Sequence, residues 1–170
     1  MSDKIRLVYY GNETLKTVAK DITNITQSTI DLIDEMYSVM YKYSGIGLAA
    51  PQVDIPERML VIDIAEYGGP KSVIINPKIK EFSDAKAPYE EGCLSLPGLS
   101  AEIIRPTEIL VNGITPDGKE VEIEASGLYA RVLQHEIDHL DGKVFIDHLE
   151  DYIRNEFRPQ LKKIKKLNKK

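Results

Sequence analysis

The sequence of 170 residues has one cysteine, Cys93, so it cannot form an internal disulfide. It has no apolar run near the roughly 20 residues of a membrane-spanning helix. Its first residues, MSDKIRLVYYGNETL, lack the apolar segment of a secretory signal. These absences argue against a disulfide-stabilised secreted protein and against a membrane protein. They predict a cytoplasmic protein with one reduced thiol and no membrane partner.

The sequence also lacks internal repeats, low-complexity tracts and long linkers. A chain of 170 residues with 42% apolar and 29% charged residues has the length and composition of one globular domain. We therefore expect a single domain over residues 1–170.

Negative charge dominates everywhere except at the end of the chain. The formal net charge is −5, but residues 154–170 hold eight basic residues and one acidic residue. The remainder therefore carries 14 basic and 26 acidic residues, a net charge of −12. An acidic body disfavours recognition of a specific nucleic-acid sequence, whereas the basic tail, expected to be helical, can approach a polyanion. The alternative is a solvated terminal helix that frays.

Hydrophobic periodicity predicts an α+β fold with largely antiparallel sheets. A helix is expected over residues 26–45, with a capping box of Ser28 and Asp31 and an end at Gly45. Short runs rich in β-branched residues predict strands at 58–64, 72–79, 101–106, 108–115 and 119–125. The TPDGKE sequence at 115–120 predicts a hairpin between the last two strands. A C-terminal helix is expected within 149–167, irregular at Pro159.

A second helix is expected over residues 127–140, between an N-cap at Ser126 and a stop at Gly142. At about 100° per residue it carries two apolar stripes, one of which holds both histidines. The stripes are Leu128, Val132, His135 and His139, and Tyr129, Leu133, Ile137 and Leu140. Such a helix belongs in the core, with the sheets packed around it.

The HEIDH sequence within this helix indicates a metal site. His135 and His139 are four residues apart and therefore on one helix face, with Glu136 beside them. The alternative is a pair of hydrogen-bonded core histidines. A catalytic metal normally takes three protein ligands and leaves one position open. A third ligand must therefore come from elsewhere in the chain.

The residues alone leave several candidates for the third ligand. In one metalloprotease class the motif ends in a third histidine, but Phe145 stands at that position. In another class a glutamate follows on a later helix, and Glu150 or Glu156 could serve. The remaining candidate is Cys93, although a lone cysteine is more often a small buried apolar residue.

Three motifs in the same order, GIGLAAPQ (45–52), EGCLS (91–95) and QHEIDH (134–139), resemble the signatures of the peptide deformylases. The resemblance covers most of residues 1–150 and implies a single catalytic domain. It implies that Cys93, His135 and His139 bind one divalent ion. Fe²⁺ would be the physiological ion, and Zn²⁺, Ni²⁺ or Co²⁺ would be substitutes. The implied reaction is removal of the formyl group from the N-terminal formylmethionine of a nascent peptide. The positive charge of the tail, and not the resemblance, suggests the ribosome as a second partner.

The resemblance also implies catalytic roles. Glu136 would take a proton from water and pass it to the leaving nitrogen. The side-chain amide of Gln52 and the backbone N–H of Leu94 would stabilise the oxyanion. Glu91 and Arg105 would form an ion pair that steadies the cysteine loop.

Substrate contacts are predicted at five residues. Ile46 and Gly92 correspond to family positions that bind the peptide backbone, and glycines such as Gly47 allow close backbone approach. Leu128 and Val132 share the histidine stripe and would line a pocket for the methionine side chain. Ser100 stands where some family members carry a substrate-binding arginine.

Two other functions compete with this prediction. A metallopeptidase that cleaves internal peptide bonds is disfavoured by Phe145 and by the missing export signal. A non-catalytic zinc module needs four protein ligands, and His148 is the one histidine left over. In that module Glu136 and Gln52 would have no role.

Overall fold

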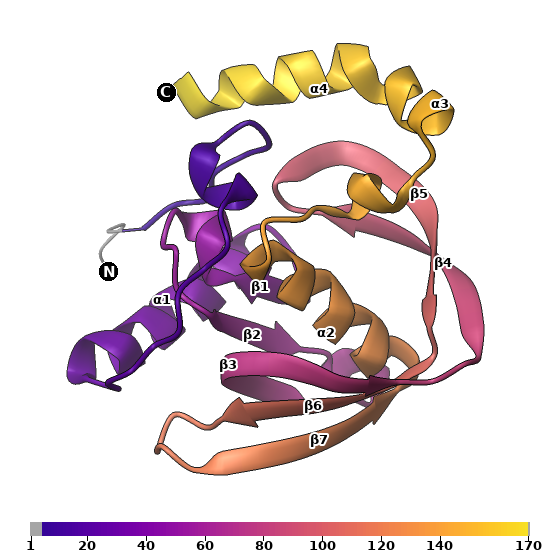
Figure 1. The fold of residues 1–170 in the computed structure, drawn as a ribbon. Coiled ribbons are helices and arrows are strands. Elements are labelled where there is room, and N and C mark those ends of the chain that lie inside the picture. The colour runs from indigo at the N-terminus through magenta and orange to yellow at the C-terminus, as the bar shows by residue number, and fades with distance from the viewer. Residues whose placement is uncertain (1–4, 170) are drawn as a thin grey trace.

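The computed structural model describes residues 5–169 and has an α+β fold (Figure 1). One sheet has the strand order β1-β2-β3-β6-β7, and β4 and β5 form a separate two-stranded sheet. Every pair of neighbouring strands is antiparallel, which confirms the predicted class. The strands are β1 (Gly47–Ala49), β2 (Met59–Asp63), β3 (Lys71–Phe82), β4 (Lys86–Cys93), β5 (Leu96–Pro106), β6 (Glu108–Ile114) and β7 (Glu120–Ser126).

Helix α2 (Gly127–Leu140) lies at the centre of the molecule, between the two sheets (Figure 1). Its bounds match the prediction, and Ser126 and Gly142 flank it as expected. Gly142 has φ +76°, and a Cβ there would lie 2.7 Å from the Lys16 carbonyl oxygen, so no other residue fits. Leu133 and Leu140 are fully buried against the five-stranded sheet. Burial of each such side chain contributes about 1.5–3 kcal/mol, which fixes the helix that carries the histidines.

Helix α1 (Gln27–Lys42) packs Met36 and Met40 against β1 and β2. The predicted capping box of Ser28 and Asp31 is wrong. The N-cap is Thr26, two residues before Ser28, and its N–H donates to Thr29 Oγ1 at 3.1 Å. The backbone leaves the helix at the C-cap Tyr43, before Gly45.

Strand β4 is missing from the predicted strands, and β5 is longer than predicted. The β4 sequence, KAPYEEGC, includes a proline, a glycine and three charged residues. Only Glu91 in this strand is buried, so the strand has no alternating apolar pattern to reveal it.

The C-terminal region consists of α3 (Asp151–Arg154), a short 3₁₀ turn, α4 (Arg158–Lys165) and a final 3₁₀ turn over Lys166–Lys169. The break directly before Pro159 confirms the predicted irregularity. Leu161 and Ile164 are buried in a cluster with Leu96 and Phe145, so this segment is packed on the domain. None of the helices in residues 5–169 is both long and apolar enough to cross a membrane.

Candidate active site

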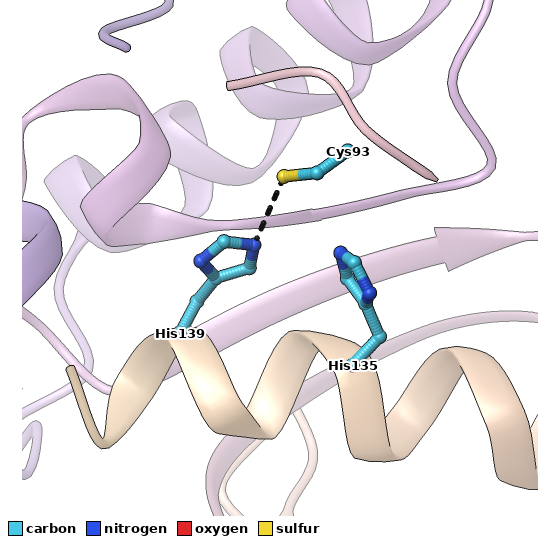
Figure 2. A group of neighbouring side chains, drawn as sticks. All are labelled: Cys93, His135 and His139. Atoms are coloured by element: carbon cyan, nitrogen blue, oxygen red, sulfur yellow. Dashed lines mark hydrogen bonds between the residues drawn. The ribbon is translucent and has the colours of Figure 1, made fainter. Parts of the chain in front are cut away.

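The structure brings Cys93, His135 and His139 together, although Cys93 is far from the histidines in sequence (Figure 2). The two histidines project from successive turns of α2, and Cys93 lies at the end of β4. One ligand atom from each residue lies within 4.8 Å of the others, and Cys93 Sγ is 3.3 Å from His139 Nε2. A thiolate and two imidazoles in this arrangement fit one zinc or ferrous ion.

The other predicted candidates for the third ligand lie elsewhere. Glu150 and Glu156 are exposed, and the Phe145 ring stacks on the His135 ring with centroids 6.1 Å apart. His148 Nε2 donates to Asp138 Oδ2 at 2.7 Å, and His148 is not part of the cluster. Within the described residues the cluster therefore has three ligands, which leaves a position open and disfavours a closed structural zinc site.

Glu91 holds His135 in position. Glu91 Oε1 lies 2.9 Å from His135 Nδ1, so the Nε2 atom is left for the cluster. Arg105 makes two hydrogen bonds to the Glu91 carboxylate, at 2.6 and 3.0 Å, which is the ion pair that the family resemblance implied. Burial acts to raise the pKa of Glu91, but hydrogen bonds from His135 and Arg105 outweigh it and hold this pKa well below its ordinary value.

Arg131 is a part of this network that sequence reasoning missed. Its guanidinium donates to Glu91 Oε2 at 2.9 Å and to the carbonyl oxygens of Ile103 and Ala87 at 2.9 and 2.7 Å. The charged head therefore points into the protein and joins α2 to both strands of the small sheet. The only sequence feature that linked Arg131 to the site was its position one helical turn before His135.

The two histidines have different surroundings. Burial lowers the pKa of His139 to about 3, so this imidazole is neutral and able to ligate. Its Nδ1 atom is buried without a hydrogen-bond partner in residues 5–169. Burial also acts to lower the pKa of His135, but hydrogen bonds to Cys93 and Glu91 outweigh it and raise this pKa. A cation at the cluster would displace the proton from His135 Nε2.

Glu136 lies beside the cluster and is almost fully buried. Burial raises its pKa to about 7, close to the pH at which a general acid–base group works best. Its Oε1 atom is buried and has no hydrogen-bond partner within the described chain. A Cβ on Gly47 would lie 2.7 Å from Glu136 Oε2 and 2.9 Å from Val132 Cγ1. The glycine at 47 therefore makes room for the carboxylate, a reason that the sequence did not reveal.

Gln52 is buried with its side chain fixed at both ends. Its Oε1 accepts from the Ala49 N–H at 2.9 Å. Its Nε2 lies 3.5 Å from Cys93 Sγ and 3.3 Å from Ser95 Oγ, so the amide donors face the cluster. Leu94 follows Cys93 in the tight turn between β4 and β5.

A cavity of about 780 Å³ opens over the cluster. All five residues predicted to contact substrate line it, together with several that the sequence did not indicate. The predicted ones are Ile46, Gly47, Gly92, Leu128 and Val132, and the others include Leu7, Tyr9, Tyr43, Leu99 and Leu167. Ser100 is outside this lining and donates to Glu90 Oε2 at 2.7 Å.

One cysteine and two histidines, beside a glutamate with no hydrogen-bond partner for its Oε1 atom in residues 5–169, lie at the base of an open cavity and indicate a mononuclear metallohydrolase. The sequence model of the polypeptide deformylase family matches residues 4–155. A peptide deformylase of Hydrogenovibrio crunogenus is 46% identical over 161 residues, which are 95% of each chain. The structure of a plant peptide deformylase matches with a TM-score of 0.90 at 37% identity, over 98% of this chain and 91% of that one.

A peptide deformylase structure from Legionella pneumophila matches with a TM-score of 0.88 at 39% identity, over 98% of both chains. The chain belongs to the polypeptide deformylase family and has peptide deformylase activity.

Proposed function

We propose that the chain removes the formyl group from the N-terminal formylmethionine of newly synthesised polypeptides and releases formate. The observation that carries this proposal is the juxtaposition of the Cys93, His135 and His139 cluster with the buried Glu136 at the base of the cavity. A divalent ion at such a cluster lowers the pKa of a water molecule toward neutrality and polarises a carbonyl group.

Glu136 moves the protons in this proposal. With a pKa raised by burial to about 7, its carboxylate can accept a proton from the attacking water and return it to the leaving nitrogen. The unpaired Oε1 atom leaves one oxygen free for this exchange. The amide bond to formyl then breaks, giving formate and a free amine.

Gln52 and Leu94 stabilise the developing negative charge on the formyl oxygen. The Gln52 amide is held in place by its bond from Ala49, so its donors need no reorganisation during the reaction. The Leu94 N–H lies next to Cys93 and supplies the second donor. Leu128 and Val132 form the apolar wall for the methionine side chain, while Ile46 and Gly92 bind the peptide backbone.

The substrate preference can be tested with three peptides of one sequence that differ only at the N-terminus. A formyl-Met peptide should release formate, whereas acetyl-Met and free-Met peptides should stay intact. Cleavage of an internal peptide bond, or equal turnover of the formyl and acetyl peptides, would contradict the proposal.

For the metal we propose Fe²⁺ as the physiological ion, with Zn²⁺, Ni²⁺ or Co²⁺ as substitutes. The mixed nitrogen and sulfur donor set is compatible with all four ions, and the choice of Fe²⁺ among them rests on the family resemblance. Metal analysis of protein purified without oxygen, compared with protein purified in air, tests the assignment. Retention of zinc alone under both conditions would refute it.

We further propose that the enzyme works in the cytoplasm and that its C-terminal segment contacts ribosomal RNA. A second cavity, of about 840 Å³, is lined by four basic residues and one acidic residue, Asp147. The basic residues are Arg154, Arg158, Lys162 and Lys165. This excess of positive charge supports binding to phosphates.

Charge removal is a sharper test of this contact than truncation, because truncation would also remove the buried Ile164. Arg158→Gln with Lys162→Gln should weaken ribosome binding and reduce its dependence on salt. Lys143→Gln, an exposed change outside the second cavity, is the control. Equal, salt-independent binding by all three proteins would contradict the proposal.

A further inference from the structure

The C-terminal segment reaches the active-site cavity. Leu167 lines this cavity although it lies beyond α4, and the residue is 36% exposed. The neighbouring part of the lining comes from the N-terminal segment, with Leu7 and Tyr9, and from Tyr43 at the end of α1. Figure 1 shows the yellow C-terminal segment next to an indigo loop of the N-terminal part of the described chain. The cavity thus has an apolar wall built from three regions that are far apart in the sequence.

Asn168 fixes this wall in place. Its Oδ1 accepts from the Tyr9 N–H at 2.8 Å, and its Nδ2 lies 3.0 Å from the Tyr9 carbonyl oxygen and 3.2 Å from the Tyr10 carbonyl oxygen. All polar atoms of the Asn168 side chain are therefore used on the backbone of two adjacent residues. These three hydrogen bonds hold the end of the chain in one position against residues 9 and 10.

A second contact holds the same two segments together. Gly11 has φ +102°, and a Cβ there would lie 2.7 Å from the Lys165 side chain. The Lys165 ammonium lies 5.7 Å from the centre of the Tyr10 ring.

The N-terminal segment is itself tied to the loops that carry the predicted oxyanion donors. The Val8 N–H donates to the Gln52 carbonyl oxygen at 2.8 Å, and the Tyr10 N–H donates to the Ser95 carbonyl oxygen at 2.9 Å. Residues 8–10 therefore connect Asn168, which is next to Leu167, to Gln52 and Ser95.

We propose that Leu167 is a specificity-determining residue, which with Tyr9 and Tyr43 contacts an apolar side chain of the substrate just after formylmethionine. Asn168 is the positioning residue for this contact. The inference rests on the proposed function, because it places the formyl group at the metal cluster. Leu128 and Val132 on α2 then contact the methionine side chain, and the following residues must leave through the rest of the cavity. The wall formed by Tyr9, Tyr43 and Leu167 is an apolar surface of this remaining part of the cavity.

The test compares Leu167→Ala, Asn168→Ala and Lys166→Ala. Lys166 is exposed and adjacent in sequence but lines neither cavity, so it is the matched control. Each metal-loaded protein is assayed with formyl-Met amide, formyl-Met-Ala-Ser and formyl-Met-Phe-Ser, and KM and kcat are determined separately. The loss of a few apolar contacts is expected to change the KM ratio by about 10-fold.

For Leu167→Ala, the ratio of KM between formyl-Met-Phe-Ser and formyl-Met amide should rise about 10-fold, with the kcat ratio unchanged. Asn168→Ala should show the same change in the KM ratio, and Lys166→Ala should show none. Unchanged ratios in Leu167→Ala, or an equal loss on all three substrates, would overturn the proposal. If wild-type protein released no formate from any of the substrates, the proposed function itself would fail.

Discussion

Replacement of Gly47 by alanine tests whether the position of Glu136 sets the rate. A Cβ at residue 47 would lie 2.7 Å from Glu136 Oε2, whereas ordinary contacts begin at 3.4 Å, so the carboxylate must move by the difference, 0.7 Å. Val132 Cγ1, at 2.9 Å, is also too close. Gly47 does not have a positive φ, so alanine fits the backbone itself. We therefore expect a folded protein with a displaced general acid–base group.

A displacement of about 1 Å at a reacting group can cost about 10²-fold in rate. The kcat of Gly47→Ala on a formyl-Met peptide should accordingly fall by about 10²-fold, with one metal ion per chain retained. The control is the same substitution in a Glu136→Gln background. There it should have little further effect, because the group that it displaces is already inactive. Near wild-type kcat, or the same fold loss in both backgrounds, would refute the reasoning.

Four further outcomes are expected. Cys93→Ser should lose most bound metal and most activity, since a hydroxyl is a poor ligand compared with a thiolate. Unchanged metal content would mean that another residue is the third metal ligand. Gln52→Leu should keep the metal and lose about 10²–10³ in kcat, and a change in KM alone would limit Gln52 to substrate binding. Arg105→Met removes one partner of the buried Glu91 carboxylate, which should lower the free energy of unfolding by about 3–5 kcal/mol. Calorimetry should therefore show a Tm that is lower by about 10 °C. Because burial raises the pKa of Glu136 to about 7 and its proton-accepting form is lost below that pKa, kcat/KM should fall on acidification. A bound cation moves the midpoint of this fall to lower pH, and a rate that increases as the pH drops would contradict the assignment.

Local patterns predicted the central helix well. The spacing of His135 and His139 fixes their common face through helix geometry alone, and the two apolar stripes of the same helix required its burial. The bounds 127–140 follow from these features and from Gly142. No local rule places Cys93 beside these histidines, because β4 has no apolar alternation. The cysteine could be assigned only through the resemblance of three motifs to a family.

Contacts between distant segments were beyond prediction from the sequence. Arg131 looks like a polar residue on the free face of a helix, yet it finds its partners on β4 and β5. Leu167 and Asn168 look like part of a charged tail, yet they meet Tyr9 at the cavity. In each case the side chain's role depends on a partner that only the folded chain brings near.

The most direct test of the central claim is a titration of metal-free protein with Fe²⁺ without oxygen, in which formate released from a formyl-Met peptide is measured against bound iron. The cluster of Cys93, His135 and His139 predicts activity that rises linearly and stops rising at about one ion per chain. Glu136→Gln should bind the same amount of iron and remain about 10²–10⁴-fold slower. Formate release that is independent of iron, or a fully loaded wild-type protein that releases none, would contradict the account.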